Sequence, residues 1–66
     1  MATNFPSDSD LLGKDIKLAQ SDHPDIEIRI VIRNGVPLFV IQNMQFNRIN
    51  VEVDNNDIIT RVVGKY

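Results

Sequence analysis

Arg48 and Asn50 are the side chains whose type and spacing best suit them to hold another part of the chain in place. They alternate with Ile49 and Val51, so in a strand they project from one face while the apolar pair faces a core. A guanidinium and an amide can each form several hydrogen bonds. Both follow an apolar segment directly, and we interpret them as a brace behind a presented loop.

The apolar segment before this strand, residues 36–44, is interpreted as that loop, within a binding stretch of about residues 35–45. Gly35 and Pro37 favour a bend followed by extended backbone, and the segment has no helical period. A buried strand over residues 36–41 fits the periodicity equally well, because short apolar runs are ambiguous. This pattern alone does not decide between an exposed loop and a buried strand.

Groups that could catalyse a reaction are too few and too scattered to predict an enzyme. The chain has no cysteine and a single histidine, His23, which beside Pro24 suits a helix end or a surface position better than a ligand. No serine has the pattern of a neighbouring base and an orienting acid. The serines are Ser7, Ser9 and Ser21. We therefore expect no catalytic residues, no metal site and no cofactor.

Length, charge and cysteine content limit the class of protein. A chain of 66 residues forms one domain, and it buries only about 60% of the surface that its unfolded form exposes, so its stability margin is small. Without cysteine the chain is disulfide-free, and it is compatible with a reducing compartment. The net charge is −2 and the basic residues are scattered, which argues against nucleic acid or an anionic membrane as the partner.

Residues 1–10 are expected to form a flexible arm. Thr3 to Asp10 is polar and acidic apart from Phe5 and Pro6, so only the Phe5 ring should dock. Residues 11–66 are expected to form the single domain. The start of the chain has neither the basic nor the apolar region of a signal peptide, and no stretch has transmembrane length. We expect a soluble protein, either cytoplasmic or secreted as a mature form.

A short helix should follow the arm. Asp15 suits its first turn, and residues 21–24, which end in His-Pro, should stop it. Ile16, Ala19 and Gln20 fall on one face of this helix. A helix of about two turns needs to pack on a sheet to be stable.

Alternation of apolar and polar residues predicts strands after the helix. Residues 26–33 place isoleucine at every second position, so one face should be purely isoleucine. Further strands are predicted at about residues 46–53 and 58–63, joined through a turn at residues 54–57 as an antiparallel hairpin. The first two strands are far enough apart in sequence to run parallel. The predicted fold class is α+β, with one short helix packed on a small mixed sheet.

Short motifs over nearly the whole chain keep the order found in one family. They are Phe5-Pro6, Leu11-Leu12-Gly13-Lys14-Asp15-Ile16-Lys17-Leu18-Ala19, His23-Pro24, Gly35-Val36-Pro37 and Phe46-Asn47-Arg48-Ile49-Asn50-Val51-Glu52-Val53-Asp54. In this order they resemble the aromatic-Pro start, helix start, helix end, loop start and following strand of the potato inhibitor I family of serine protease inhibitors, the eglin and barley chymotrypsin inhibitor type. From Arg48 onward the chain is similar to the short microbial elastase-inhibitor relatives.

The resemblance implies a substrate-like, standard-mechanism inhibitor whose exposed loop enters the cleft of a serine protease as an added strand. The partner would be a subtilisin-like or an elastase- or chymotrypsin-like enzyme. Arg48 would hold the loop from beneath and lower the cost of ordering it, and Asn50 stands where the family has a second bracing arginine. The implied reactive-loop residues are Pro37, Leu38, Phe39, Val40, Ile41, Gln42, Asn43 and Met44.

The position of the reactive bond depends on the direction of counting, because the loop is longer than is usual in the family. Counting back from Arg48 makes Gln42 the specificity (P1) residue and Gln42–Asn43 the scissile bond. Counting forward from the start of the loop makes Val40 the P1 residue and Val40–Ile41 the bond. A valine favours elastase-like or broad subtilisin-like enzymes, whereas a glutamine gives neither trypsin nor chymotrypsin an obvious reason to bind. Both registers are open.

A non-inhibitory binding or oligomerising module on the same fold is the competing hypothesis. In that case the apolar loop would pack against a second copy or a non-protease partner instead of entering a cleft. We expect a monomer or a weak homo-oligomer. Inhibition with a single slow cut would favour the inhibitor, and rapid digestion together with a concentration-dependent dimer would favour the module.

Overall fold

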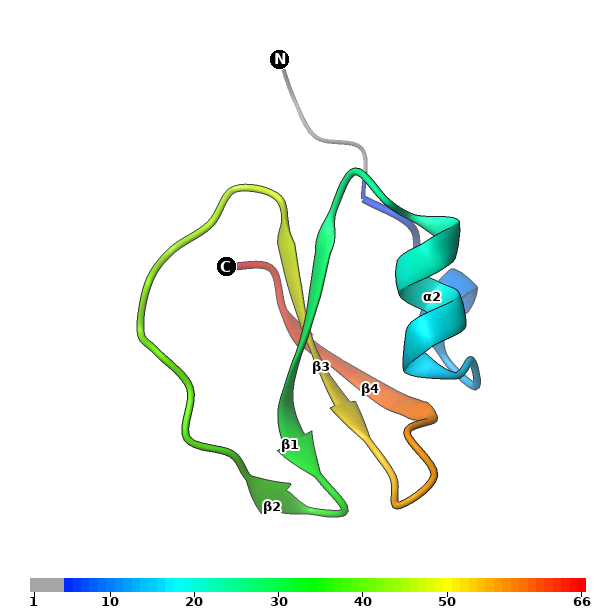
Figure 1. Ribbon diagram of the computed structural model, residues 1–66, viewed down its shortest axis with the longest axis vertical. Helices are drawn as coiled ribbons and strands as arrows, with labels where there is room; N and C mark the ends of the chain where they lie inside the picture. Colours follow the sequence, from blue (N-terminus) through cyan, green and yellow to red (C-terminus); the bar gives the residue numbers. More distant parts are fainter. Residues whose placement is uncertain (1–4) are drawn as a thin grey trace.

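The fold is a mixed β-sheet with helices on one side and a long loop on the other (Figure 1). The computed structural model describes residues 5–66. Its elements in chain order are α1 (Asp8–Leu11), α2 (Ile16–Asp22), β1 (Glu27–Arg33), β2 (Val36–Pro37), β3 (Arg48–Val53) and β4 (Ile59–Gly64). The strands lie in the order β2-β1-β3-β4, with β1 and β3 parallel and the other pairs antiparallel. The predicted α+β class is confirmed, including the parallel pair and the final hairpin.

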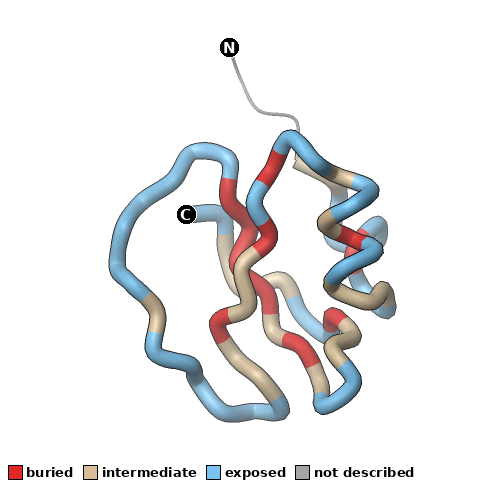
Figure 2. Tube along the Cα trace, viewed as in Figure 1, coloured by how far each residue is buried: buried red, intermediate tan, exposed pale blue. Residues whose placement is uncertain are grey.

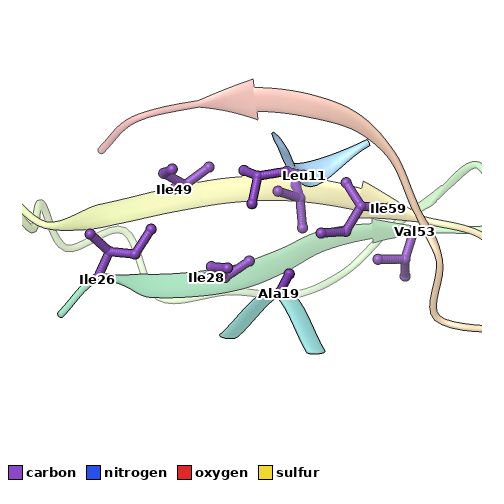
Figure 3. Packing of buried hydrophobic residues seen from close by; sticks show 8 residues of the cluster. Leu11, Ala19, Ile26, Ile28, Ile49, Val53 and Ile59 are labelled. Carbon is purple, nitrogen blue, oxygen red and sulfur yellow. The ribbon is translucent and has the colours of Figure 1, made fainter. Parts of the chain in front are cut away.

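The core lies between the helices and the face of the sheet to which β3 contributes Ile49, Val51 and Val53. These side chains are completely buried, as their alternation in the sequence predicts. The other members of the cluster come from both helices, the start of β1 and β4 (Figure 3). They are Leu11, Ala19, Ile26, Ile28 and Ile59. The apolar face of β3 thus organises the core, and its opposite face is left for other groups.

The strand β1 departs from the strict alternation predicted for residues 26–33. Ile28 is buried in the core and Ile30 packs against it, but the pairing of β1 with β3 shifts between Ile30 and Ile32. The extra residue, Val31, is buried, whereas Ile32 is only half-buried. The prediction of a face made of isoleucine alone is therefore wrong beyond Ile30, because a β-bulge changes the phase of the side chains.

The helix α2 begins and ends where the sequence predicts. The Asp15 carboxylate accepts a hydrogen bond from the Lys17 N–H at 2.8 Å, which caps the first turn. With seven residues this helix is too short to be stable without packing on the sheet. Within residues 5–66 neither helix is both long enough and apolar enough to cross a membrane.

The shorter helix α1 is not predicted from the sequence. Its first three residues lie in the segment expected to be an arm, and Leu11 follows directly. The Ser7 N–H donates to the Asp10 carboxylate at 3.2 Å across its first turn. Phe5 packs against the core, as predicted. Residues 1–4 of the expected arm lie outside the described residues.

The Gln20 side chain ties α2 to β1. Its amide nitrogen donates to the carbonyl oxygens of Ile26 at 2.6 Å and His23 at 3.2 Å, and its amide oxygen accepts from the Ile28 N–H at 2.9 Å. The strand β2 pairs only with the other end of β1. Gln20 therefore supplies the hydrogen-bond partners that a neighbouring strand would otherwise give to the start of β1.

Gln20→Ala should lower the free energy of unfolding by about 1–3 kcal/mol, because it removes the partner of the Ile26 carbonyl and the Ile28 N–H. The matched control is Ser21→Ala, an exposed change on the same helix, which should alter stability by less than about 0.5 kcal/mol. Urea unfolding followed by circular dichroism measures both. Equal stability of the two variants would show that Gln20 does not secure the edge of β1.

Candidate functional site

The β2–β3 loop, residues 38–47, runs outward from the sheet between the two strands that it joins (Figure 1). The exposed fractions of its largest outward side chains are 101% for Phe39, 73% for Ile41, 77% for Met44 and 89% for Phe46. Figure 2 shows the loop exposed along nearly all of its length. The alternative of a buried strand over residues 36–41 is wrong, because only Val36–Pro37 join the sheet and both are exposed. An exposed apolar stretch of this kind indicates an interaction surface.

Arg48 lies beneath the β2–β3 loop, on the face of β3 opposite to Ile49. It is 5% exposed. Its Nη1 donates to the carbonyl oxygen of Asn43 at 2.7 Å and to the Oδ1 atom of the same residue at 3.3 Å. Its Nε lies 3.2 Å from a carboxylate oxygen of Glu27 on β1, which places a negative charge beside the buried guanidinium. Arg48 therefore fixes one carbonyl of the loop through a charge-assisted hydrogen bond.

Arg29 binds a second carbonyl of the β2–β3 loop, and sequence reasoning missed it. The register of β1 against β3 sets Arg29 beside Asn50. Its Nε donates to the Oδ1 atom of Asn50 at 2.7 Å, and its Nη1 donates to the carbonyl oxygen of Ile41 at 2.9 Å. Alternation with Ile28 and Ile30 was the available signal, since it places Arg29 on the face away from the core. The sequence alone does not show which strand pairs with β1, so it does not show that Arg29 lies beside Asn50.

Asn50 supports the loop only through Arg29. The residue is completely buried on the same face as Arg48, and its amide oxygen accepts the hydrogen bond from Arg29. Within residues 5–66 its amide nitrogen has no hydrogen-bond partner and it forms no hydrogen bond to the β2–β3 loop. The loop contact predicted for Asn50 is therefore indirect: its amide orients a guanidinium that reaches the loop.

Alternate residues attach the β2–β3 loop to the rest of the domain. Two of them provide the carbonyls bound by the arginines. The Gln45 N–H donates to the carbonyl oxygen of Tyr66 at 3.0 Å, and the carbonyl oxygen of Asn47 accepts from the Glu27 N–H at 2.7 Å. The attached residues are Ile41, Asn43, Gln45 and Asn47. From Ile41 to Asn47, one edge of the loop is therefore bonded inward at every second residue.

From Val40 to Met44 the opposite backbone edge of the β2–β3 loop is free. Within residues 5–66 the backbone groups of Val40, Gln42 and Met44 form no hydrogen bond. In extended chain the N–H and C=O groups of one residue point to the same side, and successive residues alternate. The free groups are therefore placed to pair with a strand of another protein.

A hollow of about 230 Å³ lies between the β2–β3 loop and the sheet. Its lining residues are Arg29, Gln42, Asn43, Met44 and Tyr66. The Tyr66 ring covers Gly64 of β4, because a Cβ atom added to Gly64 would lie 2.5 Å from Cε1 of the ring. Gly64 pairs with Asn50, and directly opposed residues share a face, so the ring lies on the loop side of the sheet.

The two candidate P1 residues occupy different environments in the β2–β3 loop. Gln42 is exposed and lies between the two carbonyls that the arginines bind. Val40 is half-buried and precedes both of these carbonyls. The remaining predicted reactive-loop residues lie at the surface on the same continuous segment.

Comparison of the chain with models of known protein families and with the sequences of curated proteins gives no match. The site is therefore defined by contacts within this chain: an exposed apolar loop, two guanidinium groups beneath it and one free backbone edge. Among the described residues no group of His, Cys, Asp and Glu is arranged to bind a metal ion. These features suit the binding of a protein segment.

Gly64→Ala should displace the Tyr66 ring without unfolding the protein. The added methyl group would overlap the ring, and the ring ends a flexible side chain, so the free energy of unfolding should change by less than about 1 kcal/mol. Tyr66 is the only tyrosine and the chain has no tryptophan. Acrylamide quenching of the intrinsic fluorescence should therefore increase in this variant and stay unchanged in Thr60→Ala, an exposed change on the same strand. Equal quenching in all three proteins would contradict this packing.

Proposed function

We propose that the protein is a substrate-like, standard-mechanism inhibitor of serine proteases of the subtilisin, elastase or chymotrypsin type. The observation that carries the proposal is the hydrogen-bond pattern of the β2–β3 loop, which is attached to the domain at alternate residues from Ile41 to Asn47 and is free along its other edge from Val40 to Met44. The order of motifs that resembles the potato inhibitor I family supports it independently. The parallel pair bridged by a long exposed loop is the arrangement which that resemblance implies.

Binding would follow from pairing of the free edge with the active-site cleft. The backbone groups of Val40, Gln42 and Met44 would form main-chain hydrogen bonds with the enzyme, and the exposed apolar side chains would fill its pockets. Such complexes typically bury about 1,600 Å² in total. Because the loop is already fixed at its other edge, less conformational entropy would be lost on binding.

Slow turnover would follow from the same contacts. A protease serine that attacks the P1 carbonyl forms an acyl-enzyme and releases an amine end. In an ordinary substrate this amine diffuses away and water completes the hydrolysis. Here the arginines beneath the loop would keep the amine beside the ester, so that re-formation of the peptide bond competes with hydrolysis.

A binding or oligomerising module is the second candidate, and one observation favours it. Phe39 and Phe46 are almost fully exposed on either side of the loop centre, and a second copy or another apolar surface would cover them as effectively as a protease. Under this hypothesis the arginines would shape a docking surface without slowing any cleavage.

Titration against subtilisin, elastase, chymotrypsin and trypsin should distinguish the two candidates. The inhibitor predicts stoichiometric inhibition of at least one of the first three enzymes, with a single slow cut in residues 38–47 by mass spectrometry. Sedimentation velocity should then show a monomer at assay concentrations. Rapid digestion by every enzyme, together with a dimer that grows with concentration, would contradict inhibition and support the module.

A matched pair of substitutions should identify the P1 residue. Trypsin requires lysine or arginine at P1, so Gln42→Lys should create trypsin inhibition if Gln42 is P1, and Val40→Lys should do so if Val40 is P1. Only one variant should improve, by about a hundredfold or more in the inhibition constant, because the other lysine would not enter the charged specificity pocket. Trypsin inhibition by neither variant would argue against substrate-like binding of this loop.

A further inference from the structure

Two guanidinium groups from different strands bind carbonyls on the two sides of one residue. Arg29 of β1 donates to the carbonyl oxygen of Ile41 at 2.9 Å, and Arg48 of β3 donates to that of Asn43 at 2.7 Å. The residue between them is Gln42, whose carbonyl forms no hydrogen bond within residues 5–66. We infer that Arg29 is a second positioning residue of the loop and that the two arginines together mark Gln42–Asn43 as the reactive bond. The inference rests on the proposed inhibitory function.

The pattern of bound and free carbonyls meets the needs of a reactive bond. The carbonyl under attack has to enter the oxyanion hole of the protease, so it must be free of partners within the inhibitor. Gln42 meets this condition. Its neighbours have to stay in place during attack, and charge-assisted hydrogen bonds, which are about twice as strong as neutral ones, fix the carbonyls on both sides.

Cleavage at this bond would leave each new end with its own arginine. Arg29 and its carbonyl partner belong to the amino-terminal fragment, and Arg48 and its partner belong to the other fragment. The hydrogen bond from Arg29 to Asn50, at 2.7 Å, and the pairing of β1 with β3 then join the fragments. The amine of Asn43 can therefore attack the ester carbonyl of Gln42, re-form the peptide bond and release the protease serine.

A cut at Val40–Ile41 would leave its acyl end without a carbonyl held by an arginine. Both bound carbonyls would lie on the amine side of that cut. The nearest backbone hydrogen bond on the acyl side runs from the Leu38 N–H to the Val31 carbonyl at 2.9 Å. Residues two apart in extended chain share an edge, so the edge that Val40 would offer to an enzyme is already partly occupied by this bond.

Asn50 explains why the second arginine comes from β1. The family resemblance places a second bracing arginine at this position, but the amide here is buried and forms no hydrogen bond to the β2–β3 loop within the described part of the chain. It instead receives the Nε–H of Arg29, whose Nη1 then points to the loop. The cross-strand pairing of Arg29 with Asn50 thus supplies the guanidinium from the neighbouring strand.

Backbone order parameters test the two contacts separately and without a protease. The carbonyl that Arg29 binds shares its peptide group with the Gln42 N–H, and the carbonyl that Arg48 binds shares its peptide group with the Met44 N–H. Arg29→Met should lower the amide order parameter of Gln42 from about 0.85 toward about 0.6 and leave Met44 nearly unchanged. Arg48→Met should instead lower the amide order parameter of Met44 and leave that of Gln42 nearly unchanged.

The control is Arg61→Met, which removes an exposed arginine of the edge strand β4 that pairs with Glu52 of β3. It should change neither order parameter. Methionine keeps the unbranched stem of arginine, so packing beneath the loop is largely retained. An unchanged order parameter at Gln42 in Arg29→Met would overturn the role of Arg29, whether or not the protein inhibits a protease.

Cleavage by subtilisin, followed by mass spectrometry, tests the reactive bond. Arg29→Met and Arg48→Met should each be cut at Gln42–Asn43 about tenfold faster or more than wild type, because each loses a charge-assisted hydrogen bond. Arg61→Met should be cut at the wild-type rate. The double variant Asn50→Ala/Arg29→Met should be cut no faster than Arg29→Met alone, because both substitutions remove the same contact of Arg29 with Asn50.

The outcomes separate this inference from the proposed function. Wild-type protein that inhibits and is cut at Val40–Ile41, or Arg29→Met that is cut as slowly as wild type, would overturn the inference and leave the inhibitory function standing. Wild-type protein that is digested freely would refute the inhibitory function and the reactive bond together. The order parameters would then still decide whether Arg29 fixes the loop.

Discussion

The parallel pairing of β1 with β3 is the constraint on which the rest of the molecule depends. Parallel strands cannot be joined by a tight turn, so the chain has to make a long connection between their ends, and the β2–β3 loop is most of that connection. The same register sets Arg29 beside Asn50 and Glu27 beside Arg48. One pairing therefore produces both the exposed loop and the polar groups that attach it to the sheet.

The side of the sheet that faces the β2–β3 loop lowers the stability of this small protein. Placing Arg48 and Asn50 where apolar side chains could pack opposes folding, because buried polar groups lose hydration. The apolar side chains of the β2–β3 loop meanwhile remain in water. Both features weaken a domain of 66 residues, whose core is small. They are accounted for together if the loop is kept in an extended conformation for a partner to bind.

Several parts of the fold that depend on a few neighbouring residues were predicted correctly from the sequence. The alternation in β3, the Asp15 cap and the turn at residues 54–57 each depend on a few neighbouring residues, and each is observed. The bulge at Val31 and the contact of Arg29 with the loop depend on which strand lies beside β1, and no local pattern contains that information. The position of the proposed reactive bond was ambiguous for a related reason, since an apolar loop has no period from which to count.

The most direct test of the claim that the domain secures both sides of the reactive bond is the equilibrium between intact and cut protein. Protein cleaved at Gln42–Asn43 would be purified and incubated with a catalytic amount of subtilisin, and intact protein would be incubated in parallel. If both ends stay in place, religation competes with hydrolysis, and the two samples should reach the same mixture with a substantial intact fraction. Complete conversion of both samples to cut protein, or dissociation of the fragments, would contradict the account.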